Sequence, residues 1–256
     1  MPNLVNNLTG LDKESRKELI MTSSGLEFEQ QHFKNGCNLI LPRKKSPYIV
    51  VSAHYDFKGD GIIDNASGVA AAIAIIHTFI DNPLSNLGIE LCLFDREEKE
   101  QRGSWHYVQN LNSYPLFSLN LDCLAYGDNL LVYPLIPGGI PMFMVLKSIC
   151  ESSGTKIMAK EEIVYTNGNR RCTLKSDHIP FLYNCIPSFT ISSLDEHDFE
   201  LVKHHHSYHD DLSDVGLFSI INSRNDTIEK FSLDSWKKAV ENIEEGIKRY
   251  DILFNA

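Results

Sequence analysis

Histidine and aspartate side chains follow an apolar run near the start of the chain. Residues 48–53 predict a buried strand, which ends in His54-Tyr55-Asp56. Because side chains alternate along a strand, His54 and Asp56 point to the same side. A short glycine-containing loop leads to Asp64, where a long apolar helix is expected to begin. One imidazole and two carboxylates gathered at this place suit a divalent cation such as zinc.

Acidic residues and histidines also follow three later segments. Glu97-Glu98 come after the apolar run 89–94, and Asp122 comes after residues 118–121. A histidine-rich stretch occupies residues 204–211. Carboxylates gathered at one edge of a sheet repel each other unless cations lie between them. The pattern therefore suits two divalent ions, a carboxylate that bridges them, and a free carboxylate that accepts a proton.

The order of strands and helices indicates how these side chains are brought together. In open α/β sheets, sites form where strands end and loops begin. The alternation predicts a three-layer α/β sandwich, with a mostly parallel, mixed central sheet and helices on both faces. No linker or repeat interrupts residues 1–256, so we expect a single domain. Strands are expected at residues 26–33, 37–41, 48–53, 88–95, 117–121, 129–134 (an edge strand), 162–166 and 186–192, and helices at 11–22, 65–80, 103–111, 141–152 and 232–254.

The composition argues against several classes of protein. The chain has 256 residues, 43% of them hydrophobic, and a net charge of −10, which indicates a globular protein that does not bind nucleic acid. The longest apolar run, residues 66–80, falls short of the roughly 20 residues that span a bilayer, so no membrane association is expected. The six cysteines are scattered singly, and the N-terminus lacks the apolar core of a signal peptide. We therefore expect a cytoplasmic protein. The sequence gives no indication of oligomeric state.

Further motifs complete an order that resembles a known enzyme family. After the elements above come Gly103-Ser104, Asn120-Leu121-Asp122, Ser176-Asp177-His178, Ile186-Pro187 and His206-Ser207 with Asp210. Together they resemble the co-catalytic zinc aminopeptidases of metallopeptidase family 28, over roughly residues 48–215. The resemblance implies the zinc-exopeptidase fold, which is phosphorylase/hydrolase-like, and a hydrolase that removes N-terminal residues from peptides or acts on small amides.

The resemblance also implies two zinc ions per chain and a role for each matching residue. Glu97 is the general base, which takes a proton from the attacking water and passes it to the leaving amine. Asp56 is a carboxylate that orients His54. The implied metal ligands are His54 and Asp122 for the first zinc, Asp64 as the bridge, and Glu98 and His206 for the second zinc.

The choice of His206 rests on its neighbours. A hydroxyl residue follows it, and Asp210 stands four residues on, as in the family pattern. A carboxylate at that position could orient the ligand or brace its loop. His209 has neither neighbour. His206 is therefore favoured over His204, His205 and His209.

Each residue has a simpler interpretation when it is taken alone. His54 could be an ordinary core histidine, and Asp64 could cap the helix that follows it. Glu97-Glu98 could belong to a solvated run of charge, and Asp122 could be a turn residue. The joint occurrence in family order favours the metal site.

Other activities remain open at this point. A glutaminyl cyclase-like acyltransferase of the same superfamily uses one zinc, and a carboxypeptidase or dipeptidase would use Arg170, Arg171 or Lys175 to bind a substrate carboxylate. A non-catalytic binding protein is disfavoured because the ligands and the base are all present. Arg96 and Glu100-Gln101 depart from the family pattern, which affects the expected rim of the pocket.

Overall fold

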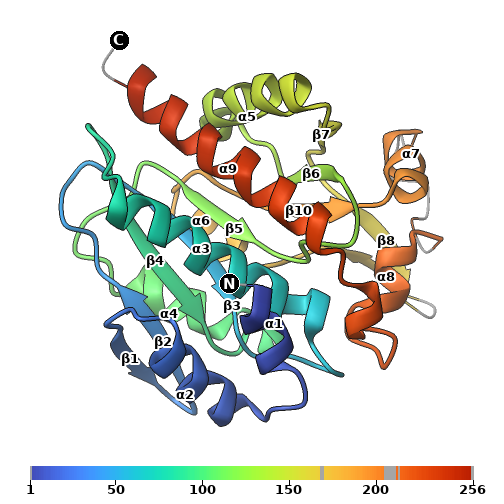
Figure 1. The fold of residues 1–256 in the computed structure, drawn as a ribbon, viewed down its shortest axis with the longest axis horizontal. Coiled ribbons are helices and arrows are strands. Elements are labelled where there is room, and N and C mark those ends of the chain that lie inside the picture. Colours follow the sequence, from blue (N-terminus) through green and yellow to red (C-terminus); the bar gives the residue numbers. More distant parts are fainter. Residues whose placement is uncertain (1, 168–169, 205–211, 213, 255–256) are drawn as a thin grey trace.

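The computed structural model describes residues 2–167, 170–204, 212 and 214–254 (Figure 1). Eight strands form one mixed sheet in the order β1-β2-β4-β3-β5-β10-β6-β7. Its centre consists of four mutually parallel neighbours, which are β4 (Gly88–Phe94), β3 (Tyr48–His54), β5 (Ser118–Leu121) and β10 (Ser188–Leu194). The carboxyl ends of these four strands therefore lie along the same edge of the sheet.

Shorter or antiparallel strands flank this centre. On one side, β1 (Glu29–Phe33) and β2 (Gly36–Leu41) form an antiparallel hairpin, and β2 runs antiparallel to β4. On the other side, β6 (Asn129–Tyr133) runs antiparallel to β10 and parallel to β7 (Ile157–Ala159). A separate two-stranded sheet pairs β8 (Val164–Asn167) with β9 (Arg170–Thr173).

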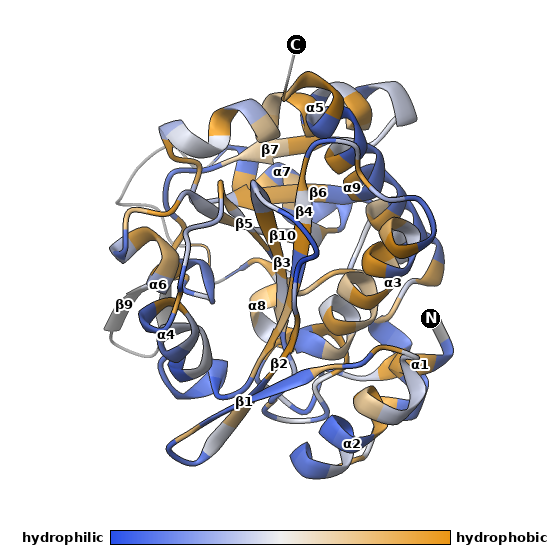
Figure 2. Ribbon diagram, turned by 90° about the vertical axis from the view of Figure 1, so that its left-hand side faces the viewer, coloured by the Kyte–Doolittle hydropathy of each residue, from blue (hydrophilic) through white to orange (hydrophobic). Residues whose placement is uncertain are grey.

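Helices cover both faces of the sheet (Figure 2). One face carries α1 (Pro2–Leu8), α2 (Lys13–Ser23), α3 (Gly68–Asp81) and α9 (Leu233–Leu253), with α5 (Ile140–Ser153) packed against α9. The opposite face carries α4 (Arg102–Gln109) and α6 (His178–Tyr183). Two further helices, α7 (Glu196–His204) and α8 (Gly216–Ile220), lie near the β6 side of the sheet (Figure 1). The predicted three-layer α/β sandwich is confirmed.

Apolar side chains on both faces explain why the central strands are buried. Every residue of β3 is buried, as is typical of a parallel strand covered by helices on both sides. Val51 faces the core formed with α3 and α9, while Val50 faces the core formed with α4 and α6. Gly246 of α9 lies so close to Leu146 of α5 that a Cβ atom would stand 2.5 Å from its side chain. The absence of a side chain at Gly246 therefore lets these two helices pack together.

Most predicted elements are present, and two expectations need correction. Residues 129–134 were expected at a sheet edge, but β6 has a neighbour on each side because the short strand β7 pairs with it. The apolar helical stretch is also longer than expected, since Ile62–Asp81 is 20 residues long and is apolar enough to cross a membrane by length and composition. In the structure, 83% of its most apolar window is buried inside the protein. Its hydropathy is therefore accounted for by its place in the core.

Candidate metal centre

His54 ends β3, and each of its ring nitrogens faces a different partner. Nδ1 lies 2.9 Å from the backbone oxygen of Asp56 and 3.6 Å from its carboxylate. Nε2 lies 3.1 Å from Oδ1 of Asp64 and 3.5 Å from Oδ1 of Asp122. Because a carbonyl can only accept, Nδ1 carries hydrogen, and Nε2 is the nitrogen that can offer a lone pair to an ion. Asp56 thus orients His54, as expected, but the closer contact is with the backbone oxygen of Asp56 and not with its carboxylate.

Asp64 stands in the turn Ile62–Ser67, which leads into α3. Its backbone is not helical, with φ −113° and ψ 84°, and Asn65 accepts the hydrogen bond from the backbone N–H of Gly68 at 3.0 Å. Asn65 also donates to the backbone oxygen of Leu121 at 2.8 Å, which ties this turn to the end of β5. The cap at the start of the helix therefore comes from Asn65, and the carboxylate of Asp64 faces His54.

Asp122 follows β5 and is held by the Ser176-Asp177-His178 segment. The Ser176 hydroxyl donates to Oδ2 of Asp122 at 2.6 Å, and the Asn120 side chain donates to Ser176 at 2.8 Å. This chain of hydrogen bonds leaves Oδ1 of Asp122 directed at the imidazole of His54. Ser176, which the sequence singled out only as part of the family pattern, thus fixes the carboxylate of Asp122.

The electrostatics of this cluster fit a bound cation. His54, Asp64 and Asp122 are all buried, and each offers one ligand atom within 4.8 Å of the others. Burial raises the pKa of Asp64 to about 7. Burial also acts to lower the pKa of His54, but hydrogen bonds with the surrounding carboxylates raise it well above the usual value. One imidazole nitrogen and carboxylate oxygens match the ligands of zinc, which binds such atoms at about 2.0–2.2 Å.

Glu97 and Glu98 follow β4 in the short turn Glu97–Lys99 and are also held by Asp56. The two carboxylate oxygens of Asp56 accept the backbone N–H of Glu97 at 2.9 Å and of Glu98 at 3.3 Å. Glu97 is 8% exposed, and burial raises its pKa well above the usual value. Gln101 donates to Oε1 of Glu97 at 3.0 Å. Asp56 therefore joins the strand end that carries His54 to the turn that carries the expected base.

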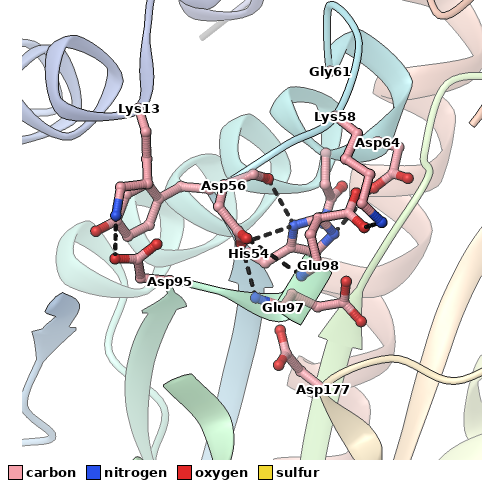
Figure 3. A network of polar contacts seen from close by, with 12 residues as sticks. Lys13, His54, Asp56, Lys58, Gly61, Asp64, Asp95, Glu97, Glu98 and Asp177 are labelled. Atoms are coloured by element: carbon pink, nitrogen blue, oxygen red, sulfur yellow. Dashed lines mark hydrogen bonds and ion pairs between the residues drawn. The ribbon is translucent and has the colours of Figure 1, made fainter. Parts of the chain in front are cut away.

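Asp177 and Glu98 stand on either side of Glu97 (Figure 3). Burial raises the pKa of Asp177 to about 7. Oε2 of Glu98 lies 2.6 Å from Nζ of Lys58, whereas its Oε1 is buried and has no hydrogen-bond partner among the described residues. That oxygen is free to bind a cation. Lys58 was not singled out from the sequence, and no pattern there pointed to it.

A cleft of about 860 Å³ opens over these carboxylates. Asp64, Glu97, Glu98 and Asp122 line its acidic floor. Trp105, Ile179 and Tyr183 line one wall, and Leu217, Phe218 and Ile221 line another. Glu100 and Gln101, which depart from the family pattern, also border the cleft, so that departure does lie at the rim. The cleft thus combines an acidic floor with apolar walls.

The structure brings together six of the seven predicted site residues. His206 lies outside the described residues, as do His205, His209 and Asp210. His204 is described and ends α7, where its exposed ring lies 3.4 Å from the Glu200 carboxylate. The role of His206 as a ligand of the second zinc therefore stays a prediction.

Comparisons with known proteins identify a family and a fold. The profile of Peptidase family M28 matches residues 38–244. Among solved structures, a Zn-dependent exopeptidase from Parabacteroides distasonis has a TM-score of 0.69 at 15% identity, over 96% of each chain. Porphyromonas gingivalis glutaminyl cyclase has a TM-score of 0.69 at 15% identity, over 97% of this chain and 95% of that chain.

A zinc aminopeptidase from Bacillus subtilis is also similar in structure. It has a TM-score of 0.60 at 20% identity and is covered over 50% of its length, so this chain spans about half of that protein. The match extends over 84% of this chain. None of the curated protein sequences matches the chain. At these identities, the structural likeness establishes the shared fold.

Proposed function

The chain belongs to peptidase family M28, and from this premise we propose that it is a zinc-dependent aminopeptidase that uses two zinc ions per chain. The observation that carries the proposal is the buried group of His54, Asp64 and Asp122, since Asp64 and Asp122 line a cleft that Glu97 also lines. Metal ligands and a candidate base thus face the same solvent-accessible space. We propose a peptide or a small amide as the substrate.

The residues of the centre would have different roles in hydrolysis. His54, Asp64 and Asp122 would hold the first ion, while Glu98 would contribute to the second with His206. Bound zinc polarises a scissile carbonyl and brings the pKa of a water molecule close to neutrality. The chain itself must then supply a group that moves the proton.

Glu97 is the group best placed to move that proton. It lies in the cleft, and its Oε1 is held by Gln101. Its carboxylate would accept a proton from the attacking water and donate it to the amine that leaves. A cation bound nearby would favour the ionised form, and so would offset the rise in the pKa of Glu97 that burial causes. Asp56 keeps this glutamate in place through the backbone.

A glutaminyl cyclase-like acyltransferase is the second candidate. The ion pair between Lys58 and Glu98 favours it, because the ammonium group already neutralises the carboxylate that a second ion would use. A centre with one tightly bound zinc would then result. A carboxypeptidase or dipeptidase is also compatible with the cleft, since Lys175 lines it and could pair with a substrate carboxylate.

A metal titration coupled to a substrate screen tests the proposal. Zinc-free protein should be titrated with zinc and then assayed on aminoacyl anilides, N-acyl amino acids and peptides with an N-terminal glutamine. We expect zinc-dependent cleavage of the aminoacyl substrates. Ammonia release from the glutamine peptide with saturation at one zinc would favour the cyclase instead, and cleavage of only N-acyl substrates would favour the carboxypeptidase.

Two variants of the same loop provide the control. Asp64→Asn should abolish both zinc binding and turnover. Asp60→Asn should leave both unchanged, because Asp60 lies on the same loop but is exposed. Turnover that does not depend on zinc in the wild-type protein would overturn the proposal.

A further inference from the structure

The loop that carries Asp64 has backbone N–H groups that find no acceptor within the loop itself. Asp64 and Asn65 both have non-helical φ and ψ values inside the turn Ile62–Ser67. The turn is buried throughout. Buried backbone N–H groups need partners, so those of Ile63 and Asp64 must be satisfied from elsewhere in the chain.

Asp226 supplies these partners from the far end of the sequence. Its Oδ1 accepts the N–H of Ile63 at 2.7 Å, and its Oδ2 accepts the N–H of Asp64 at 3.1 Å. The side chain of Asp226 is fully buried. Hydrogen bonds to an ionised carboxylate are stronger than those between neutral groups, and two of them fix direction as well as distance. Asp226 therefore determines where the backbone of Asp64 lies.

Arg16 holds the same loop through groups of the opposite kind. Arg16 is 1% exposed, and its guanidinium group donates to the backbone oxygens of Asp60 and Gly61. It also lies 3.6 Å above the ring of Phe57. The carbonyls at the start of the loop are thus bound by a cation and the amides at its end by an anion. Arg16 and Asp226 also attract each other.

Close packing brings the loop and the Asp226 segment together. Gly59 has φ +66°, and a Cβ atom there would stand 2.3 Å from the backbone oxygen of Ser223. The hydrogen bonds of Asp226 are therefore supported by direct contact between the two backbones. This contact leaves little room for the loop to adjust.

We propose that Asp226 is a positioning residue for the metal centre, which acts through the backbone of Asp64 and is assisted by Arg16. The proposal rests on the proposed function only in so far as Asp64 binds the ion. Asp226 is fully buried and is not among the described residues that line the cleft. Through the backbone, it holds the carboxylate of Asp64 3.1 Å from Nε2 of His54, where the two side chains could bind one ion.

A pair of matched variants tests this role. Asp251 is 3% exposed and accepts the N–H groups of Ser85 and Leu87 through its own carboxylate, at 2.8 Å and 2.7 Å. It has the same chemistry as Asp226 but braces a loop before β4, at the opposite edge of the sheet. Asp226→Asn and Asp251→Asn should both lower the Tm of the zinc-free protein. Only Asp226→Asn should lower the affinity for the first equivalent of zinc. We expect a loss of about 10- to 100-fold, as is typical when the residues that support a metal ligand are changed.

The readout is the dissociation constant of zinc, measured by calorimetry on protein whose folding is checked by circular dichroism. Arg16→Lys is the milder variant, since it keeps the charge but loses the forked geometry. It should weaken zinc binding less than Asp226→Asn, and it decides the question if Asp226→Asn does not fold. Zinc affinity that is unchanged in both Asp226→Asn and Arg16→Lys would overturn the positioning role. An equal loss of zinc affinity in Asp226→Asn and Asp251→Asn would overturn it too. Failure of the wild-type protein to bind zinc would instead overturn the proposed function, and the positioning role with it.

Discussion

The carboxylate of Asp56 supports both glutamates of the centre, so its replacement by asparagine tests how far the site depends on it. Asp56 is 6% exposed, and its two oxygens accept the backbone N–H groups of Glu97 and Glu98. In Asp56→Asn, one N–H loses its acceptor and faces the new NH₂ group, which costs about 1–3 kcal/mol. The remaining bond loses its charge, which costs about 1 kcal/mol. We therefore expect the free energy of unfolding to fall by about 2–4 kcal/mol.

This loss can be measured together with its effect on activity. In a chain of this size, 1 kcal/mol corresponds to roughly 2–4 °C, so the Tm should fall by roughly 4–16 °C. Turnover should fall on the order of 100-fold, because displacement of a catalytic group by about 1 Å has such an effect. Calorimetric unfolding and steady-state assays on the same preparation provide both values, with Asp60→Asn as the control. An unchanged Tm, or a lowered Tm with wild-type turnover, would refute the reasoning.

Three further predictions concern the metal ions. Burial raises the pKa of Asp64 to about 7, and, against the effect of burial, hydrogen bonds with carboxylates raise the pKa of His54 well above its usual value, so zinc must displace protons from both side chains below about pH 7. Its affinity should therefore fall by at least about tenfold per pH unit as the pH decreases. Titrations in buffers of different ionisation enthalpy should show this proton release. An affinity independent of pH between about 5 and 7, a range that lies below the pKa of the Asp64 carboxyl, would contradict it. Lys58→Met should strengthen the second zinc equivalent by about fivefold, because a half-exposed ion pair with Glu98 worth about 1 kcal/mol is removed; an unchanged second affinity would count against that pairing. His206→Ala should lower the zinc stoichiometry while His204→Ala leaves it intact, and metal analysis showing the reverse would reassign the ligand.

The sequence predicted the centre of the sheet because its residues obey local rules. The run 48–53 and the run 91–94 carry apolar residues on both faces, which is typical of a strand covered on both sides. The polar residues that follow these runs therefore had to lie at one edge of the sheet. By contrast, β7 contains only the residues Ile157–Ala159, which is too short for a periodic signal, and so β6 was expected at an edge.

The predicted site residues came from order and resemblance, whereas their supports depend on contacts between distant parts of the chain. Arg16 reads as one basic residue on an amphipathic helix, yet it is buried against the loop before Asp64. Asp226 reads as a turn residue in a polar stretch, and its partner lies 162 residues away. Lys58 looked like an ordinary loop lysine, although it pairs with Glu98. No local pattern encodes such contacts, because they exist only once the strands have brought the loops together.

Glu97→Gln tests most directly the claim that this chain performs zinc-dependent hydrolysis with Glu97 as the base. Zinc content and turnover of an aminoacyl substrate should be measured on the same samples of the wild-type and variant proteins. The amide is nearly the same size and can keep its contact with Gln101, but it cannot accept a proton. We predict that zinc is retained and that turnover falls by about 10²–10⁴-fold. Wild-type turnover in the zinc-loaded variant would contradict the account.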